Sequence, residues 1–342
     1  MSRFARIARS AALGLAFAAA SASAFAQAPT RIKFTLDWRF EGQTSFVWLG
    51  LAKGYFQQEG VDLQVDAGSG SAAAVSRIAT GAYDGGLGDL SSLIEYIGNN
   101  PGQTRMQMVY VLYDEAPLAY YALKKSGIKT IADLAGKPVT GAPFEITRKL
   151  WPMFAKAAKV DAGSVKWTNV DPALRTNAVI KGDVIAAGGF YNIPLEFEAR
   201  GVKRDDLTEL RVSDLGVRVY GNGVMFSSKM INENPKAVAG FVRAFNRSFR
   251  EGLADPAESV RHLKAREPIV DEKLEVSRFT MLFLAMLTDR TRSSGLGAIN
   301  KLVLENQVDE VTTSFNLKTK PNADLIFNSS FLPSRGDRLP LK

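Results

Sequence analysis

The chain of 342 residues contains no cysteine, so neither disulfides nor thiol chemistry can exist in it. Its one histidine, His262, lies in a charged helical stretch (VRHLKAR) away from the ends of the expected strands. Without cysteine or a second histidine, the sequence does not favour soft metal sites or Cys/His and Ser/His nucleophilic pairs. HExxH, GxSxG and dinucleotide glycine patterns are also missing. We therefore expect no metal, no cofactor and no catalytic residues.

Long runs of lysine and arginine are missing as well, and the net charge of +8 is scattered along the chain. Scattered charge is typical of a solvated surface, so we expect no nucleic-acid partner. After the first 26 residues, no apolar stretch has the length of a transmembrane helix.

The first 26 residues have the pattern of a secretory signal peptide. A basic start (MSRFARIARS) precedes a short apolar run and small residues at Ala24 and Ala26. We predict cleavage after Ala26, which releases residues 27–342 into the periplasm. No cysteine follows this site, which excludes a lipid-anchored lipoprotein. A buried N-terminal helix is the alternative.

Strand and helix patterns alternate along the mature chain. Predicted strands at residues 31–38, 61–68, 84–89 and 106–114 alternate with helical patterns, and this order favours a mostly parallel sheet covered by helices. The pattern restarts at residue 118 and continues to 216, before one more strand at 222–230 and a helical region up to 307.

This repetition predicts an α/β fold with two lobes. Lobe I would hold residues 27–115 and 222–342, and lobe II residues 116–221, with chain crossings near 114–117 and 220–222. A single doubly wound sheet is the alternative.

Ligands of open α/β sheets bind at the carboxyl ends of strands and the amino ends of helices. The first strand ends in Asp37 and Trp38, and Gln43 opens the next helix. Trp38 could offer a ligand a flat face or cap the core, and Asp37 could cap a helix or accept a hydrogen bond from a ligand amine. The second strand ends in AGSGSA, where Ser69 and Ser71 suit either an anion or an ordinary capped turn.

The other strand ends carry further aromatic and polar residues. An aromatic wall with a few polar groups is the usual composition of a small-molecule site. Some of these aromatic side chains should belong to the core, and Asp89 or Ser91 is expected to cap a helix. The predicted ligand-binding residues are Asp37, Trp38, Gln43, Ser69, Asp89, Tyr113, Phe144, Glu145, Phe190, Tyr191 and Asn192.

Several stretches resemble solute-binding proteins of ABC importers, in particular the nitrate/sulfonate/taurine and thiamine-pyrimidine-precursor binding family. They are LDW at 36–38, LAKGYFQQEGVDLQV at 51–65 and FSSKMINENPKAVAGFVRAF at 226–245. GGFYNIPLEFEARG and NADLIFNSSFLP resemble the pyrimidine-precursor branch. The resemblance covers essentially the whole mature chain. It implies a type II periplasmic binding protein, with a ligand closed between two lobes and then delivered to a membrane permease.

The resemblance also implies roles for single residues. Asp37, Trp38 and Gln43 match ligand contacts of the first lobe, and Tyr191 and Asn192 match the aromatic residue and the amide of the second. Ile193 stands near an acidic position of the pyrimidine branch, which is a departure from that pattern. Enzyme relatives that build the thiamine pyrimidine need a cysteine-rich motif, which this chain lacks.

We therefore predict a monomeric periplasmic receptor, not an enzyme, for a small flat heterocyclic or aromatic solute. The main alternative is a receptor for a small anion such as sulfonate, taurine or nitrate, which would use the GSGS turn. Asp37 and Glu145 in the cleft argue against an anion. An enzyme on the same bilobal fold and a sensor domain are further alternatives.

Overall fold

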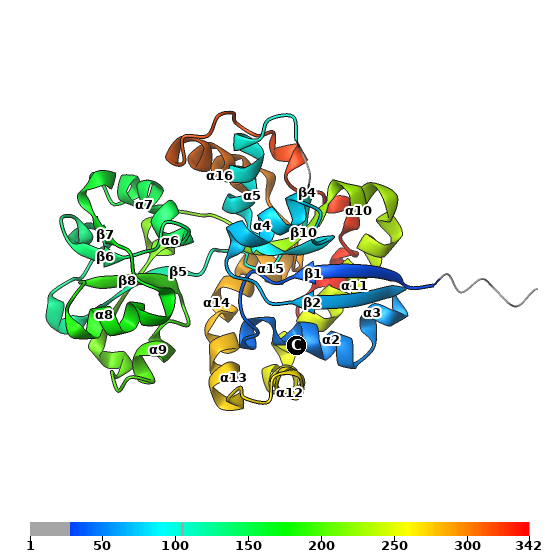
Figure 1. Cartoon of the computed structure of the whole chain (residues 1–342), viewed down its shortest axis with the longest axis horizontal. Coiled ribbons are helices and arrows are strands. Elements are labelled where there is room, and N and C mark those ends of the chain that lie inside the picture. Colours follow the sequence, from blue (N-terminus) through cyan, green and yellow to red (C-terminus); the bar gives the residue numbers. More distant parts are fainter. Residues whose placement is uncertain (1–27, 104–105, 342) are drawn as a thin grey trace, which may run out of the picture.

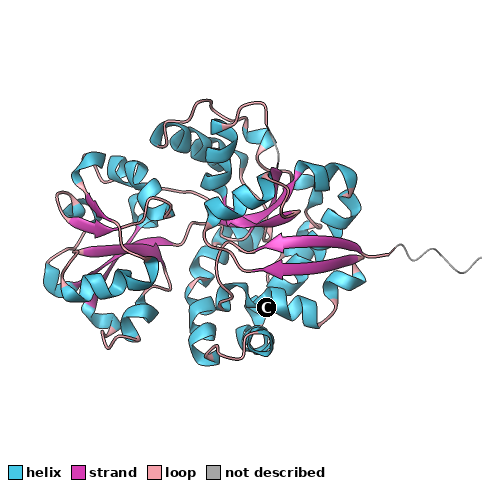
Figure 2. Ribbon diagram, in the orientation of Figure 1, coloured by secondary structure: helices cyan, strands magenta, loops and turns pink. Residues whose placement is uncertain are grey.

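The computed structural model describes residues 28–103 and 106–341, and the predicted signal peptide lies outside this range. Within these residues the strands form two five-stranded sheets, and helices cover both (Figures 1 and 2). We call the sheet that contains the first strand, with its helices, lobe I, and the other sheet with its helices lobe II. Figure 1 shows lobe II in green on the left.

The sheet of lobe I is mixed. Its spatial order is β2 (Val61–Asp66), β1 (Thr30–Thr35), β3 (Gly85–Asp89), β10 (Asn222–Ser227) and β4 (Met106–Val111). β1 pairs in parallel with β2 and β3, as the sequence predicts for a β-α repeat. β10, which forms after the chain returns from lobe II, runs antiparallel between β3 and β4.

Side-chain alternation and aromatic packing position these elements. In β2, Val61, Leu63 and Val65 are buried while Asp62 and Gln64 are exposed, the pattern of a strand with one covered face. The long helix α11 packs on α2 and α3 through a buried aromatic cluster. The helices of lobe I are α2 (Ser45–Ala52), α3 (Tyr55–Gln58), α4 (Ser71–Ala79), α5 (Leu90–Asn99), α10 (Ser228–Glu233), α11 (Pro235–Ala254), α12 (Pro256–Arg266), α13 (Glu272–Met281), α14 (Phe283–Met286), α15 (Asp289–Ser294), α16 (Lys301–Ser314) and α17 (Arg335–Arg338).

Lobe II has a second mixed sheet, in the order β7 (Lys166–Thr168), β6 (Pro138–Thr140), β8 (Ala186–Phe190), β5 (Leu118–Leu123) and β9 (Leu207–Arg211). Its helices are α6 (Ile146–Lys149), α7 (Trp151–Ala157), α8 (Arg175–Lys181) and α9 (Pro194–Glu198). Pro152 interrupts the predicted helix, since α6 ends just before it and α7 begins with it in the first turn.

The chain passes between the sheets twice, after β4 and after β9. The two crossings are hydrogen-bonded to each other, because the amide of Ala116 donates to the carbonyl of Val219 at 2.8 Å and that of Gly221 to Tyr113 at 3.0 Å. Two short neighbouring connections of this kind are where one lobe can rotate relative to the other. In the part of the chain that the structure describes, no helix combines the length and the apolar composition needed to cross a membrane.

Candidate ligand-binding site

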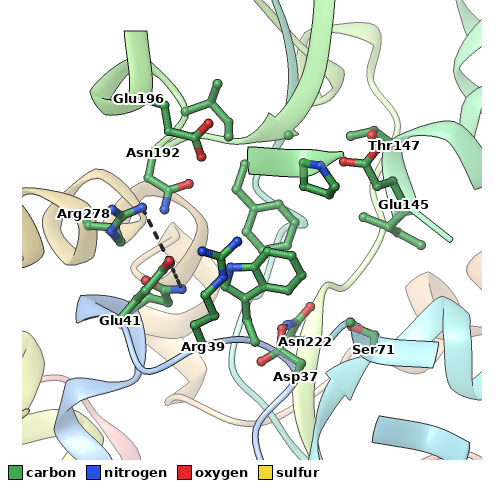
Figure 3. Close-up of a pocket in the computed structure, with 18 of the residues that line it drawn as sticks. Asp37, Arg39, Glu41, Ser71, Glu145, Thr147, Asn192, Glu196, Asn222 and Arg278 are labelled. Carbon is green, nitrogen blue, oxygen red and sulfur yellow. Dashed lines mark hydrogen bonds and ion pairs between the residues drawn. The ribbon is translucent and has the colours of Figure 1, made fainter. Parts of the chain in front are cut away.

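A cavity of about 330 Å³ lies between lobe I and lobe II, where strand ends of both sheets meet (Figure 3). Each lobe supplies about half of its lining. Lobe I and the first crossing contribute Asp37, Trp38, Arg39, Glu41, Gln43, Thr44, Gly70, Ser71, Ser92, Leu112, Tyr113, Asn222 and Arg278. Lobe II contributes Phe144, Glu145, Ile146, Thr147, Pro172, Ala173, Arg175, Gly189, Phe190, Asn192, Ile193, Glu196 and Arg200.

Aromatic side chains form part of both walls. Trp38 follows β1, Phe190 ends β8, and Phe144 lies before α6 with half of its surface exposed. Phe190 meets the buried Tyr113 edge to face, with ring centres 5.9 Å apart. Such a wall can hold a flat ring by stacking and by removing apolar surface from water.

Two glycines at the end of β8 let lobe II pack closely behind the cavity. A Cβ at Gly188 would lie 2.6 Å from Thr147 Oγ1, and one at Gly189 would lie 2.4 Å from Ile193 Cγ1. Real Cβ atoms essentially never show such distances, so a Cβ at either position would force Thr147 or Ile193 to shift. The GG pair therefore allows Thr147, Phe190 and Ile193 to share one wall.

Asp37 and Asn222 form the floor of the lobe I side. The amide Nδ2 of Asn222 donates to Asp37 Oδ2 at 2.5 Å, and the two residues are 185 positions apart in the sequence. Burial raises the pKa of Asp37 to about 6, although the hydrogen bond from Asn222 acts in the other direction. A carboxyl with this pKa can accept from a ligand N–H at neutral pH and donate below pH 6.

A second polar cluster joins η1 (Gly42–Thr44) to α13. Arg278 bridges Glu41 Oε2 at 3.6 Å and Glu275 Oε2 at 3.1 Å. Glu275 also accepts the backbone amide of Gly42 at 2.6 Å, and burial raises the pKa of Glu275. Gln43 Nε2 donates to Glu41 at 3.1 Å, but among the described residues nothing donates to its buried Oε1. That oxygen is a buried acceptor without a partner.

The lobe II wall carries an arginine between two carboxylates. Arg175 lies 3.4 Å from Glu145 Oε1 and 2.9 Å from Glu196 Oε1. Glu145 also accepts the amide of Ala142, so it begins α6 with its charge already partnered. Burial still raises the pKa of Glu145, since the desolvation outweighs the hydrogen bond and the nearby arginines.

Three of the predicted ligand-binding residues do not line this cavity. Ser69 is exposed on the turn before α4, and its neighbours Gly70 and Ser71 line the cavity instead. Asp89 is the N-cap of α5, where its Oδ1 accepts from the amides of Ser91 at 2.7 Å and Ser92 at 3.3 Å. The capping role expected for Asp89 or Ser91 therefore falls to Asp89.

Tyr191 is the third. It follows Phe190 directly, and its buried ring turns away from the cavity, under the guanidinium of Arg211 at 5.1 Å from the ring centre. Its hydroxyl lies 3.4 Å from Ser213 Oγ. The stacking role that the resemblance implies for Tyr191 is therefore not supported by its position, and Phe190 faces the cavity in its place.

The remaining predicted residues, Asp37, Trp38, Gln43, Tyr113, Phe144, Glu145, Phe190 and Asn192, all line the cavity. Sequence reasoning missed most of the charged lining, including Arg39, Glu41, Arg175, Glu196 and Arg278. Arg39 and Glu41 follow the first strand end directly, and this position could have identified them. Arg278 lies on a helix far along the chain, with no local signal.

Asp89→Asn tests how much the buried Asp89 carboxylate destabilises the folded protein when it is ionised. Burial raises the pKa of Asp89 from 3.8 to about 6 in the folded protein, with Asp37 as a nearby like charge. The protein therefore gains stability from a neutral Asp89 below the unfolded pKa, and loses that stability as the pH rises through 6. Asparagine keeps an oxygen for the cap and cannot ionise.

Relative to the unchanged protein, Asp89→Asn should gain on the order of 2 kcal/mol in unfolding free energy between pH 4.5 and pH 7.5. Urea unfolding of both proteins at the two pH values measures this difference. Asp37 titrates in both proteins, and its repulsion of Asp89 is part of the measured difference. A difference that stays constant with pH would contradict the assignment.

His262 lies in α12 and does not line the cavity. Among residues 28–103 and 106–341, no three or more His, Cys, Asp or Glu side chains are grouped to hold a metal ion.

Comparison with known proteins shows the family to which this chain belongs. The model of the family described as NMT1/THI5 like matches residues 42–259, which include most strands of both lobes. A riboflavin-binding protein of Chloroflexus aurantiacus is 26% identical over 238 residues, or 68% of this chain; the chain spans 65% of that relative's length. A 4-amino-5-hydroxymethyl-2-methylpyrimidine phosphate synthase of Legionella pneumophila is 23% identical over 73% of this chain and 78% of its own length.

Among solved structures, the periplasmic aliphatic sulphonate binding protein of Escherichia coli superposes with a TM-score of 0.71. The match covers 90% of this chain and 94% of that one at 14% identity. This likeness confirms the predicted fold, in which two α/β lobes are arranged as in periplasmic binding proteins.

Proposed function

Because this chain belongs to the NMT1/THI5-like family, we propose that it is the solute-binding component of an ABC importer. Its ligand would be a small flat heterocycle, such as a thiamine pyrimidine precursor or a riboflavin-like compound. The observation that carries this proposal is the cavity between the lobes, with Trp38 on one side and Phe144 and Phe190 on the other. A ring held between aromatic side chains of two lobes favours the state in which the lobes are closed.

The polar lining suits a nitrogen heterocycle. Asp37 is an acceptor for ligand N–H groups, and Asn192 adds an amide that both donates and accepts. Lobe closure removes water, and hydrogen bonds then contribute more because the local dielectric falls. In this proposal the protein acts in the periplasm as a monomer, with lobes at 27–115 plus 222–342 and 116–221, and delivers its ligand to a membrane permease.

The synthases among the relatives raise the question of catalysis, and we propose that this chain is not an enzyme. It contains no cysteine, and its single histidine lies on α12, away from the cavity lining. The carboxylates Glu41, Glu145 and Glu196 are paired with arginines. Formation of a pyrimidine phosphate in a long incubation of the purified protein with candidate precursors would contradict this proposal.

One observation favours a small anion as a second candidate ligand. Gly70 and Ser71, at the beginning of α4, line the cavity, and no side chain caps this helix. Free amides at a helix start can hold an oxyanion. A sulfonate or nitrate receptor would bind there and would have little need for Trp38.

A thermal-unfolding screen of residues 27–342 separates these proposals. The panel contains 4-amino-5-hydroxymethyl-2-methylpyrimidine, riboflavin, taurine, an alkanesulfonate and nitrate. A ligand at about a hundred times its Kd should add roughly 2.7 kcal/mol to the unfolding free energy, which gives a clear rise in Tm. We expect this rise with a heterocycle. A rise only with the sulfonate, taurine or nitrate would replace the heterocycle proposal with the anion one.

A further inference from the structure

Arg39 is a cation at the cavity that has no carboxylate partner. It follows Trp38 on the loop after β1, lines the cavity, and is exposed. Its guanidinium lies 5.3 Å from the centre of the Trp38 ring. Among the described residues no carboxylate lies within ion-pair distance of it. Figure 3 shows Arg39 beside the lobe I cluster of Glu41 and Arg278, below Asn192 and Glu196 of lobe II.

The other arginines of the cavity are already bound. Arg175 pairs with two glutamates, and Arg278 also pairs with two. Arg200 donates to Asn177 Oδ1 at 2.7 Å and to the backbone carbonyls of Glu196 and Ala173. Each of these side chains is held in place by the protein itself. Arg39 differs because its donors remain available.

We propose that Arg39 determines specificity by binding an oxyanion group of the ligand, so that the ligand is a flat heterocycle carrying a phosphate or a carboxylate. This inference rests on the proposed function and deepens it. Guanidinium has a planar set of donors that matches phosphate and carboxylate oxygens in pairs. Because the Arg39 guanidinium lies over the Trp38 ring, a ligand ring on the uncovered part of the indole would bring its substituent within reach of the guanidinium.

The carboxylates of the cavity are tied to partners within the protein. At the level of sequence, Asp37 and Glu145 argue against any anion. In the structure Glu145 is paired with Arg175, and Asp37 accepts from Asn222 while burial raises its pKa to about 6. Arg175 thus compensates one of the two charges of Glu145 and Glu196, and Asp37 is held within lobe I by Asn222, whereas the positive charge of Arg39 is open to a ligand.

The test compares ligands that share a ring and differ in charge. Isothermal titration would use riboflavin against riboflavin 5′-phosphate. It would also use 4-amino-5-hydroxymethyl-2-methylpyrimidine against its phosphate and against 4-amino-2-methylpyrimidine-5-carboxylate. The proteins are the unchanged chain, Arg39→Met, and Arg31→Met as a control. Arg31 is an exposed lobe I arginine whose guanidinium contacts Gln64, outside the cavity.

We expect the unchanged protein to bind at least one anionic form more tightly than its neutral partner. Arg39→Met should weaken that form by about 10- to 100-fold, the usual range for a charge-assisted bidentate contact, and leave the neutral form nearly unchanged. Arg31→Met should change neither. The stronger anion, phosphate or carboxylate, identifies the group.

Other outcomes overturn the inference in distinguishable ways. Neutral rings that bind as tightly as their anionic forms, with no charge-dependent effect of Arg39→Met, would overturn the role of Arg39 and leave the heterocycle proposal standing. An equal loss for neutral and anionic ligands would make Arg39 a contact for lobe closure instead. If no ring in the series binds, the proposed function fails, and this inference fails with it.

Discussion

Replacing Trp38 with alanine is expected to weaken binding of the heterocyclic solute by roughly 10- to 100-fold, since stacking of a ring on an aromatic side chain is worth about 1–3 kcal/mol. Trp38 is half-buried at the cavity wall, next to Arg39, and no hydrogen bond of its indole ties it to the rest of the described chain. Its truncation should therefore remove the stacking surface and leave the fold intact. Isothermal titration measures the loss, and thermal unfolding without ligand verifies the fold.

Tyr191→Leu is the matched control for this experiment. Leucine removes the aromatic ring but keeps an apolar side chain in a buried position outside the cavity. We expect a change in Kd of less than about threefold, because the ring contacts Arg211 and Ser213 and not the ligand. A large loss of affinity in Tyr191→Leu, with Trp38→Ala unaffected, would restore the residue implied by the sequence and refute the site described above.

The contrast between Phe190 and Tyr191 shows where sequence reasoning about this site ends. Both residues follow the same predicted strand, and both are aromatic. Which of them faces a ligand depends on how the chain turns after β8, where the amide of Ile193 donates to the carbonyl of Phe190 at 3.0 Å. Neighbouring residues at such a turn point in different directions, and residue type alone does not show which of the two side chains faces the cavity.

Charged partners are harder still to predict. Arg175 opens α8, whereas Glu145 and Glu196 come from other parts of lobe II. Arg278 reaches the cavity because Glu275, one turn before it, accepts the amide of Gly42 and docks α13 on η1. These contacts depend on tertiary packing, which leaves no local pattern in the sequence.

The sequence predicted the fold better than the site, because the order of strands and helices follows from the periodicity of apolar residues. The alternation in β2 and the order of strands and helices predicted the two lobes, and residues 114–117 lie between β4 and β5. The antiparallel insertion of β10 did not follow from periodicity. A buried strand of small and apolar residues is compatible with parallel or antiparallel pairing. The register of β10, in which Asn222 lies opposite Asp89, depends on contacts between residues far apart in the sequence.

Arg290→Met should lower the unfolding free energy by about 3 kcal/mol, because it leaves a buried carboxylate without its ion-pair partner. Arg290, on α15, forms an ion pair with Asp114 in the first crossing. The Asp114 side chain is only 5% exposed. Thr288 donates its hydroxyl to the same carboxylate. Burial lowers the pKa of Arg290 to about 10, so the guanidinium remains charged at neutral pH.

The same arginine also touches the second crossing, since its guanidinium lies 5.0 Å from the centre of the Tyr220 ring. Both connections between the lobes are thus held against α15 by one side chain. Urea unfolding measures the loss, with Arg292→Met as the control, because Arg292 is exposed on the same helix. Asp114→Asn combined with Arg290→Met should recover part of the stability, since it removes the uncompensated charge. If Arg290→Met and Arg292→Met were equally stable, the ion pair would contribute nothing, and the crossings would depend on their backbone hydrogen bonds alone.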